Sequence, residues 1–161
     1  MAAPVSPAAG QHITAAFWQT EITDRWTDLY GAWTSYTPTW TGATTNPSLG
    51  NGTLVAAYKR SDQSKSVYVR LRLVAGTTTT YGTGAWLFSL PSGLPPAAIQ
   101  SLGGFLLDNS TVNRYAVSAY LTAANGIERI AYNGTTGLTG LAPFTWAVSD
   151  SLMLSGVYET T

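Results

Sequence analysis

Cysteine is missing from this sequence of 161 residues, and histidine occurs once, as His12. Without cysteine the chain can form neither a disulfide nor a thiolate metal site. A zinc site with one histidine would have to rest on carboxylates, an unusual ligand set for zinc. A Ser–His–Asp triad would need His12 to reach the rest of the fold from near the N-terminus. We therefore expect no metal, no cofactor and no enzymatic activity, and we interpret His12 as an exposed residue.

Charged residues are scarce, at 10% of the chain against roughly 25% in an average soluble protein. The eight basic and eight acidic residues cancel, so the net charge gives no indication of a nucleic-acid partner or an anionic membrane. Two explanations of the low charge stay open. Sister subunits or a larger assembly cover the surface, or Thr, Ser and Asn side chains solvate it.

Long apolar runs are absent too. None approaches the roughly 18 residues that a membrane-spanning helix needs, and the first ten residues carry no basic stretch followed by an apolar one. We therefore expect no membrane insertion and no secretory signal peptide. Residues 1–12 are rich in Ala and Pro, a composition that favours an extended arm over a helix. We assign this arm to attachment.

A single helical pattern follows, over residues 13–33. Thr14 is a suitable N-cap, and Gly31 marks the end of the helix. Apolar side chains recur at steps of three or four residues and share one face. With Ile13, which fits a hydrophobic staple, they form the helix stripe: Ile13, Trp18, Ile22, Trp26, Leu29 and Trp33. Because so short a helix is unstable alone in water, we predict that the stripe serves oligomerisation and attachment.

From residue 34 to 161 the apolar period changes to two, which predicts a β head. Residues 54–60 and 67–74 form a hairpin pair; in the second, Val67 to Leu73 alternate between apolar and polar faces. Further strands are expected at residues 86–90, 104–107, 115–122, 127–132, 144–148 and 152–158. Pro38 would remove a hydrogen bond from a central strand, so residues 36–41 form an edge strand or a connector. The pattern predicts a mainly β protein, with an antiparallel sandwich or jelly-roll head preceded by one short helix and an arm.

Candidate site residues in the head are few. Tyr68, Arg70 and Arg72 share one strand face and form a possible ligand face, able to stack on a sugar or pair with acids of a partner. A solvated outer face is the alternative. Asp108 and Asp150 are the best-placed carboxylates for glycosidase chemistry, although capping of turns explains them more simply.

Four segments combine into a distinctive pattern. They are Gly10-Gln11-His12-Ile13-Thr14-Ala15-Ala16-Phe17-Trp18, Trp33-x-Ser35-Tyr36-Thr37-Pro38-x-Trp40-Thr41, Leu49-Gly50-Asn51-Gly52-Thr53-Leu54-x-x-x-Tyr58 and Gly82-x-Gly84-x-x-x-Phe88-Ser89-Leu90-Pro91. Together they resemble a family of small virion proteins from tailed phages of actinobacteria, described as minor tail or fibre-like structural proteins. The resemblance covers residues 10–95. The chain departs from a long fibre in having no extended shaft and no collagen-like repeat.

The resemblance implies a virion protein that forms a homotrimer and contacts other virion proteins through its arm and helix. Its β head would face outward and bind a glycan on the host surface. A capsid decoration protein would use the same parts to grip the capsid; we favour the tail. Tyr36 and Trp40 would pack the helix against the head. A hypothesis of a different class is a carbohydrate-binding module built on aromatic side chains such as Trp86 or Trp146.

Overall fold

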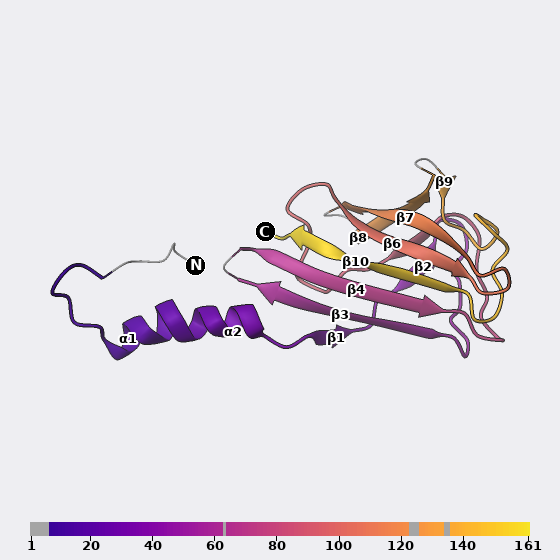
Figure 1. Ribbon diagram of the computed structural model, residues 1–161. Coiled ribbons are helices and arrows are strands. Elements are labelled where there is room, and N and C mark those ends of the chain that lie inside the picture. Colours follow the sequence, from indigo (N-terminus) through magenta and orange to yellow (C-terminus); the bar gives the residue numbers. More distant parts are fainter. Residues whose placement is uncertain (1–6, 63, 123–125, 134–135) are drawn as a thin grey trace.

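An antiparallel β-sheet makes up most of the structure, and one helical segment precedes it (Figure 1). The computed structural model describes residues 7–161 except residues 63, 123–125 and 134–135. The helical segment consists of α1 (Ala15–Trp18), the π-helical turn η1 (Gln19–Thr23) and α2 (Asp24–Tyr30). The mainly β fold with one short N-terminal helix is thus confirmed. Residues 1–6 of the expected arm lie outside the described residues, and residues 7–13 form neither helix nor strand.

The helix begins where the sequence predicts. The Thr14 hydroxyl accepts a hydrogen bond of 3.1 Å from the amide of Phe17, which satisfies one of the free amides at the helix start. An ion pair of 2.8 Å between Arg25 and Glu21, four residues apart, supports the helix from its polar side. The last helical residue is Tyr30, directly before Gly31.

Across the described residues, ten strands form the sheet. They are β1 (Thr34–Tyr36), β2 (Trp40–Gly42), β3 (Thr53–Ser61), β4 (Ser66–Val74), β5 (Trp86–Phe88), β6 (Gln100–Asp108), β7 (Asn113–Thr122), β8 (Gly126–Tyr132), β9 (Thr136–Gly137) and β10 (Ser151–Glu159). Their order is β1-β3-β4-β10-β6-β7-β8-β5-β2, with β9 paired to β8 off this path. The C-terminal strand β10 therefore lies inside the sheet, between β4 and β6.

Alternation of burial explains the long strands. In β4 the side chains of Val67, Val69, Leu71 and Leu73 are buried, whereas Tyr68, Arg70 and Arg72 are exposed. Since successive strand residues point to opposite faces, one face of the sheet forms the core and the other meets solvent. The predicted hairpin of β3 and β4 is confirmed by their continuous pairing from Thr53↔Val74 to Ser61↔Ser66.

The strand predicted at residues 144–148 is wrong. These residues belong to the loop between β9 and β10, where the Asp150 carboxylate accepts a hydrogen bond from the amide of Ala147 and closes a turn. Trp146 is nevertheless buried, and its ring stacks at 5.3 Å on that of Phe144. The alternating aromatics thus reflect a loop that packs on the core, not a strand in a ladder.

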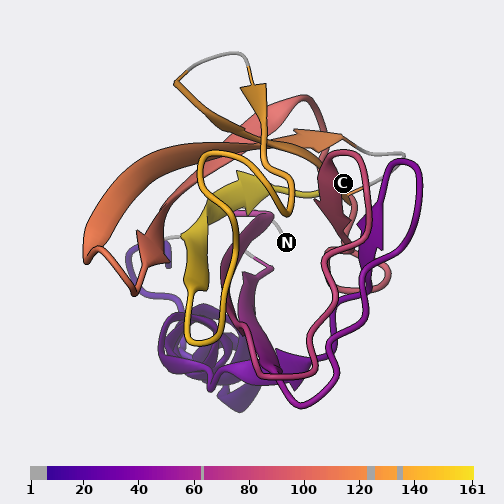
Figure 2. The same cartoon turned by 90° about the vertical axis from the view of Figure 1, so that its right-hand side faces the viewer.

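The two edges of the sheet belong to one short segment. β1 and β2 are the terminal strands of the nine-strand path, yet only residues 37–39 separate them. Four residue steps span at most about 14 Å, so the sheet must curl until its edges nearly meet. Figure 2 shows this curl, with the strands wrapped around the core. Pro38 lies between the edge strands, which agrees with the prediction that residues 36–41 are an edge strand or a connector.

Aromatic rings fill part of the core. Trp86 is fully buried and lies 4.8 Å, between ring centroids, from both Trp40 and Trp146. Its indole N–H donates a 2.9 Å hydrogen bond to the carbonyl of Tyr81. Pairs of this kind add to the stability gained by burial alone.

The glycine and threonine motifs hold two loops together. Asn51 lies opposite the threonine run: its Oδ1 accepts from the amide of Thr78 at 3.0 Å, and its Nδ2 donates to the hydroxyl of Thr77 at 2.8 Å. Gly50 has a φ of 57°, and a Cβ there would meet the carbonyl of Thr78. The Leu49–Leu54 motif is therefore a structural loop anchor.

Candidate functional site

The helix stripe follows the helical segment, which extends away from the head (Figure 1). Ile13 lies before α1 and Trp33 after α2, so these two flank the helix. The stripe's described side chains are exposed to solvent by 36% or more: Ile13 (50%), Trp18 (52%), Ile22 (36%), Trp26 (55%) and Trp33 (42%). Leu29 belongs to α2, but its side chain lies outside the described residues. Contiguous exposed apolar side chains of this kind mark surfaces that contact another protein. The stripe is therefore the first candidate site.

Tyr30 enlarges the stripe, although the sequence reasoning does not single it out. It is 70% exposed, and its ring stacks on that of Trp26 with centroids 5.3 Å apart. The signal was present in the sequence, because residues four apart share a helix face.

The helix is tied to the head at its C-terminal end. The Asp28 carboxylate accepts one hydrogen bond from the hydroxyl of Ser61 and one from the amide of Asp62, each of 2.7 Å. Ser61 is the last residue of β3, and Asp62 follows it at the start of the β3–β4 hairpin turn. Asp28 thus couples the stripe to the head through the hairpin turn.

The outer face of the sheet, which we define as the side turned away from the core, carries the second candidate site. Tyr68, Arg70 and Arg72 are exposed together on it, as the sequence predicts. Cross-strand partners point to the same face, so the strand register extends the set. Arg72 lies between Val55 and Met153, and Met153 lies opposite Phe105.

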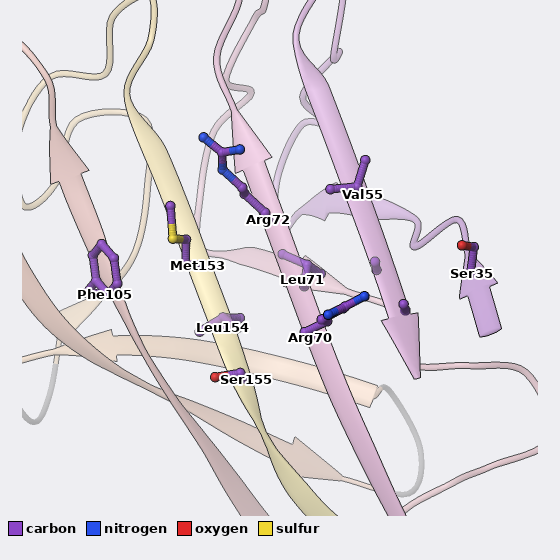
Figure 3. A pocket seen from close by; sticks show the side chains of 11 residues that line it. Ser35, Val55, Arg70, Leu71, Arg72, Phe105, Met153, Leu154 and Ser155 are labelled. Atoms are coloured by element: carbon purple, nitrogen blue, oxygen red, sulfur yellow. The ribbon is translucent and has the colours of Figure 1, made fainter. Parts of the chain in front are cut away.

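A groove crosses this face, with a volume of about 530 Å³. Small side chains make its floor, because Arg70 lies between Ala57 and Ser155, and Ser155 lies opposite Gly103. A row of larger side chains, Val55, Arg72, Met153 and Phe105, forms one wall, and Figure 3 shows these four across β3, β4, β10 and β6. No acidic residue lines the groove. Apolar walls with a few charged groups are typical of ligand sites.

Trp33 joins the two candidate sites. The guanidinium carbon of Arg70 lies 4.4 Å from the centroid of a Trp33 ring, within the range of a cation–π contact. The stripe therefore continues onto the outer face at Arg70. This contact fixes Arg70 and leaves Arg72 as the cation that reaches into solvent.

Tyr36 and Trp40 lie in the head rather than on the helix. Trp40 packs edge-on against Trp86 and stacks on Phe88, with centroids 4.8 and 6.0 Å apart. Tyr36 packs edge-on against Tyr58, and burial raises the pKa of Tyr36 to about 12. Within one chain both residues thus stabilise the curled sheet, and their packing against a helix stays a prediction.

Asp108 and Asp150 cap neighbouring turns. Asp108 accepts hydrogen bonds from Ser110 and Thr111, the two hydroxyl donors at 2.7 Å each. These hydrogen bonds, that from the Thr111 side chain first, lower the pKa of Asp108. Asp150 accepts from the amides of Asn109 and Ala147 at 2.8 and 2.6 Å. Both carboxylates therefore have structural partners, which supports the capping interpretation.

The remaining candidates are placed as follows. Trp86 and Trp146 are buried, so neither forms an exposed sugar platform. His12 is exposed. Across the described ranges, no group of three or more His, Asp or Glu side chains could hold a metal ion. No helix in the same ranges has the length and apolar character to cross a membrane.

Comparison with known proteins gives one informative similarity. Over 115 residues, 71% of its length, the chain is 29% identical to the Mu-like prophage FluMu defective tail fiber protein of Haemophilus influenzae. The matched region is 18% of that protein, so the chain spans less than a fifth of this relative's length. No family model matches the chain, and no solved structure does.

Proposed function

We propose that this protein is a structural component of a phage tail fibre, a trimer that attaches to the virion through its N-terminal segment and displays its β head. The similarity to a prophage tail fiber protein supports the tail-fibre role. This similarity favours the tail over the capsid as the location. The resemblance of residues 10–95 to minor tail proteins of actinobacterial phages favours the same role. The head would contact the host surface.

The exposed helix stripe is the observation that carries the proposal. Trp18, Ile22 and Trp26 are exposed on the helical segment, and the exposed Ile13 and Trp33 flank it. Burying apolar surface contributes about 25 cal/mol per Å². Three copies that bring their stripes together would bury these side chains. The Glu21 and Arg25 side chains, which pair with each other, are already mostly covered within one chain, at 14% and 20% exposed.

Sedimentation tests the proposal. The wild-type chain should sediment as a trimer, and a Trp18→Ser/Trp26→Ser variant as a monomer with a folded head. Thr27→Ser, which alters an exposed neighbour of Trp26 outside the stripe, is the matched control and should stay trimeric. A monodisperse wild-type monomer with a folded helix would contradict trimerisation through the stripe.

Truncation tests attachment separately. A chain that begins at residue 34 should give a soluble head that no longer incorporates into virions, because it lacks both the arm and the stripe. Immunoblotting of purified particles measures incorporation. If the truncated head still joins virions, the attachment role of residues 1–33 is wrong.

A further inference from the structure

Basic residues are concentrated on the outer face although the net charge is zero. Lys59 lies opposite Tyr68, and Arg129 lies opposite Tyr120, so both point outward with these exposed tyrosines. Arg114 is exposed on β7, two residues before Ala116, which pairs with Phe105. Five of the eight basic residues thus share this face: Lys59, Arg70, Arg72, Arg114 and Arg129.

The acidic residues have partners elsewhere. Six of the eight carboxylates already form hydrogen bonds or ion pairs within the chain: Glu21, Asp24, Asp28, Asp62, Asp108 and Asp150. Glu159 pairs across strands with Ser66, and Ser66 lies about 20 Å along β4 from Arg72. The described carboxylates therefore leave Arg72, which lines the groove, without a counter-charge.

Three of these cations have no partner within the described ranges. Arg72, Arg114 and Arg129 form no ion pair and no hydrogen bond with any described residue. In a second copy of the chain, six of the eight acids would be engaged in the same bonds. An acidic partner outside this protein is therefore the better source of the complementary charge.

We infer that the groove on the outer face binds an acidic glycan, a sugar chain that carries carboxylate groups; this rests on the proposed display of the head toward the host. Arg72 would hold the carboxylate, since a guanidinium pairs with it through two parallel hydrogen bonds. Arg70, about 7 Å along the strand, adds positive charge at the groove floor.

The walls and the floor fit the sugar itself. Phe105 and Met153 offer apolar surface beside Arg72 to the C–H face of a sugar ring, and the hydroxyls of Ser35 and Ser155 line the same groove (Figure 3). Gly103 leaves open space next to Ser155, because nothing lies within 4 Å of the position its Cβ would take. A linear chain can therefore cross the strands along the row of small residues.

Calorimetry with the full chain tests this site. The probe is a tetramer of galacturonic acid, and maltotetraose is its neutral counterpart. The acidic probe should bind and the neutral one should not. Arg72→Ala should weaken binding about tenfold or more, because a charge-assisted pair is lost. Arg72→Lys keeps the positive charge but cannot donate two parallel hydrogen bonds to one carboxylate. This variant should weaken binding less than Arg72→Ala does.

Two further variants separate the groove from general attraction between charges. Ser155→Phe fills the groove and keeps every cation, so it should abolish binding. Arg60→Ala removes a cation that pairs with Asp62 away from the groove and should leave binding unchanged. The site would be overturned if Arg60→Ala weakened binding as much as Arg72→Ala does. It would also be overturned if the acidic probe did not bind at all.

Sedimentation of the same variants distinguishes the two proposals. A trimer that binds no acidic probe would overturn the glycan site and leave the proposed function intact. A monomer that binds the probe through Arg72 would overturn the trimer of the proposed function and leave the glycan site intact. If Ser155→Phe dissociates the trimer, the groove is a subunit contact and the glycan site is wrong.

Discussion

Val112 adopts a left-handed backbone conformation, with a φ of 60°, in the turn between β6 and β7. A branched side chain is strained there, and Val112 recovers little by burial because it is 62% exposed. Val112→Gly should raise the free energy of unfolding by about 1 kcal/mol, measured by urea denaturation. Val55→Gly, which changes an exposed valine within strand β3, is the control and should lower it. If both substitutions changed the free energy of unfolding equally, the backbone of Val112 would not be strained.

Asp108 links stability to pH. Its pKa is lower in the folded chain than the ordinary value, because the side chain of Thr111 and then that of Ser110 donate to the carboxylate. Its contribution to stability is complete above the ordinary pKa and is lost as the pH falls through the lowered one. Asp108→Asn should therefore be less stable than wild type at pH 7, and the difference should vanish in strong acid.

Thr111→Val tests whether the Thr111 hydrogen bond lowers the pKa of Asp108. It removes the largest hydrogen-bond contribution and should bring the pKa of Asp108 back toward its ordinary value, as followed by NMR of the carboxyl carbon. An unchanged titration in this variant would mean that Thr111 does not control the group.

The helix and the hairpin turn form one coupled element through Asp28. Asp28→Ala removes both acceptors for Ser61 and Asp62, so the Asp62 amide should exchange hydrogen roughly tenfold faster. Asp24→Ala is the control, since the Asp24 carboxylate accepts from Gln19 within the helical segment. Exchange that is equally fast in both variants would show that Asp28 does not anchor the helix.

Elements with one buried apolar face and one exposed polar face could be predicted from the sequence. β4 alternates a buried valine or leucine with an exposed polar residue, and Thr14 starts the helix with its own side chain, so local pattern suffices for both. Residues 144–148 alternate in the same way, but Asp150 bends them into a loop through the Ala147 amide. The bond joins residues only three apart, so the capping role expected of Asp150 is the local signal that distinguishes this loop from a strand.

The second candidate site depends on information that a single strand does not contain. Tyr68, Arg70 and Arg72 could be found as neighbours on one strand. Their association with Phe105, Met153 and Trp33 follows from strand register and from the position of the helix. Sequence reasoning therefore found Arg72 of the groove wall and Arg70 of its floor, and it missed the other lining residues.

At the scale of the whole molecule, the two ends of the chain differ in importance for the fold. β10 pairs with β4 over nine residues and with β6 over five. Among the described residues, the helix is bonded to the head through Asp28, near its C-terminal end. A chain that ends at residue 150 should lose cooperative thermal unfolding, because the sheet is divided at its centre. The head beginning at residue 34 is the control and should unfold cooperatively; similar transitions in both would contradict this role of β10.

The curl of the sheet also affects whether heads aggregate when many copies of the protein are crowded together. An exposed sheet edge normally invites a strand of another molecule to add to it, the first step of aggregation. Here the edge strands β1 and β2 are three residues long each, and Pro38, which has no amide hydrogen, lies between them. Neither edge offers a long row of free hydrogen-bonding groups. Heads crowded side by side are thereby protected from fusing into a continuous sheet.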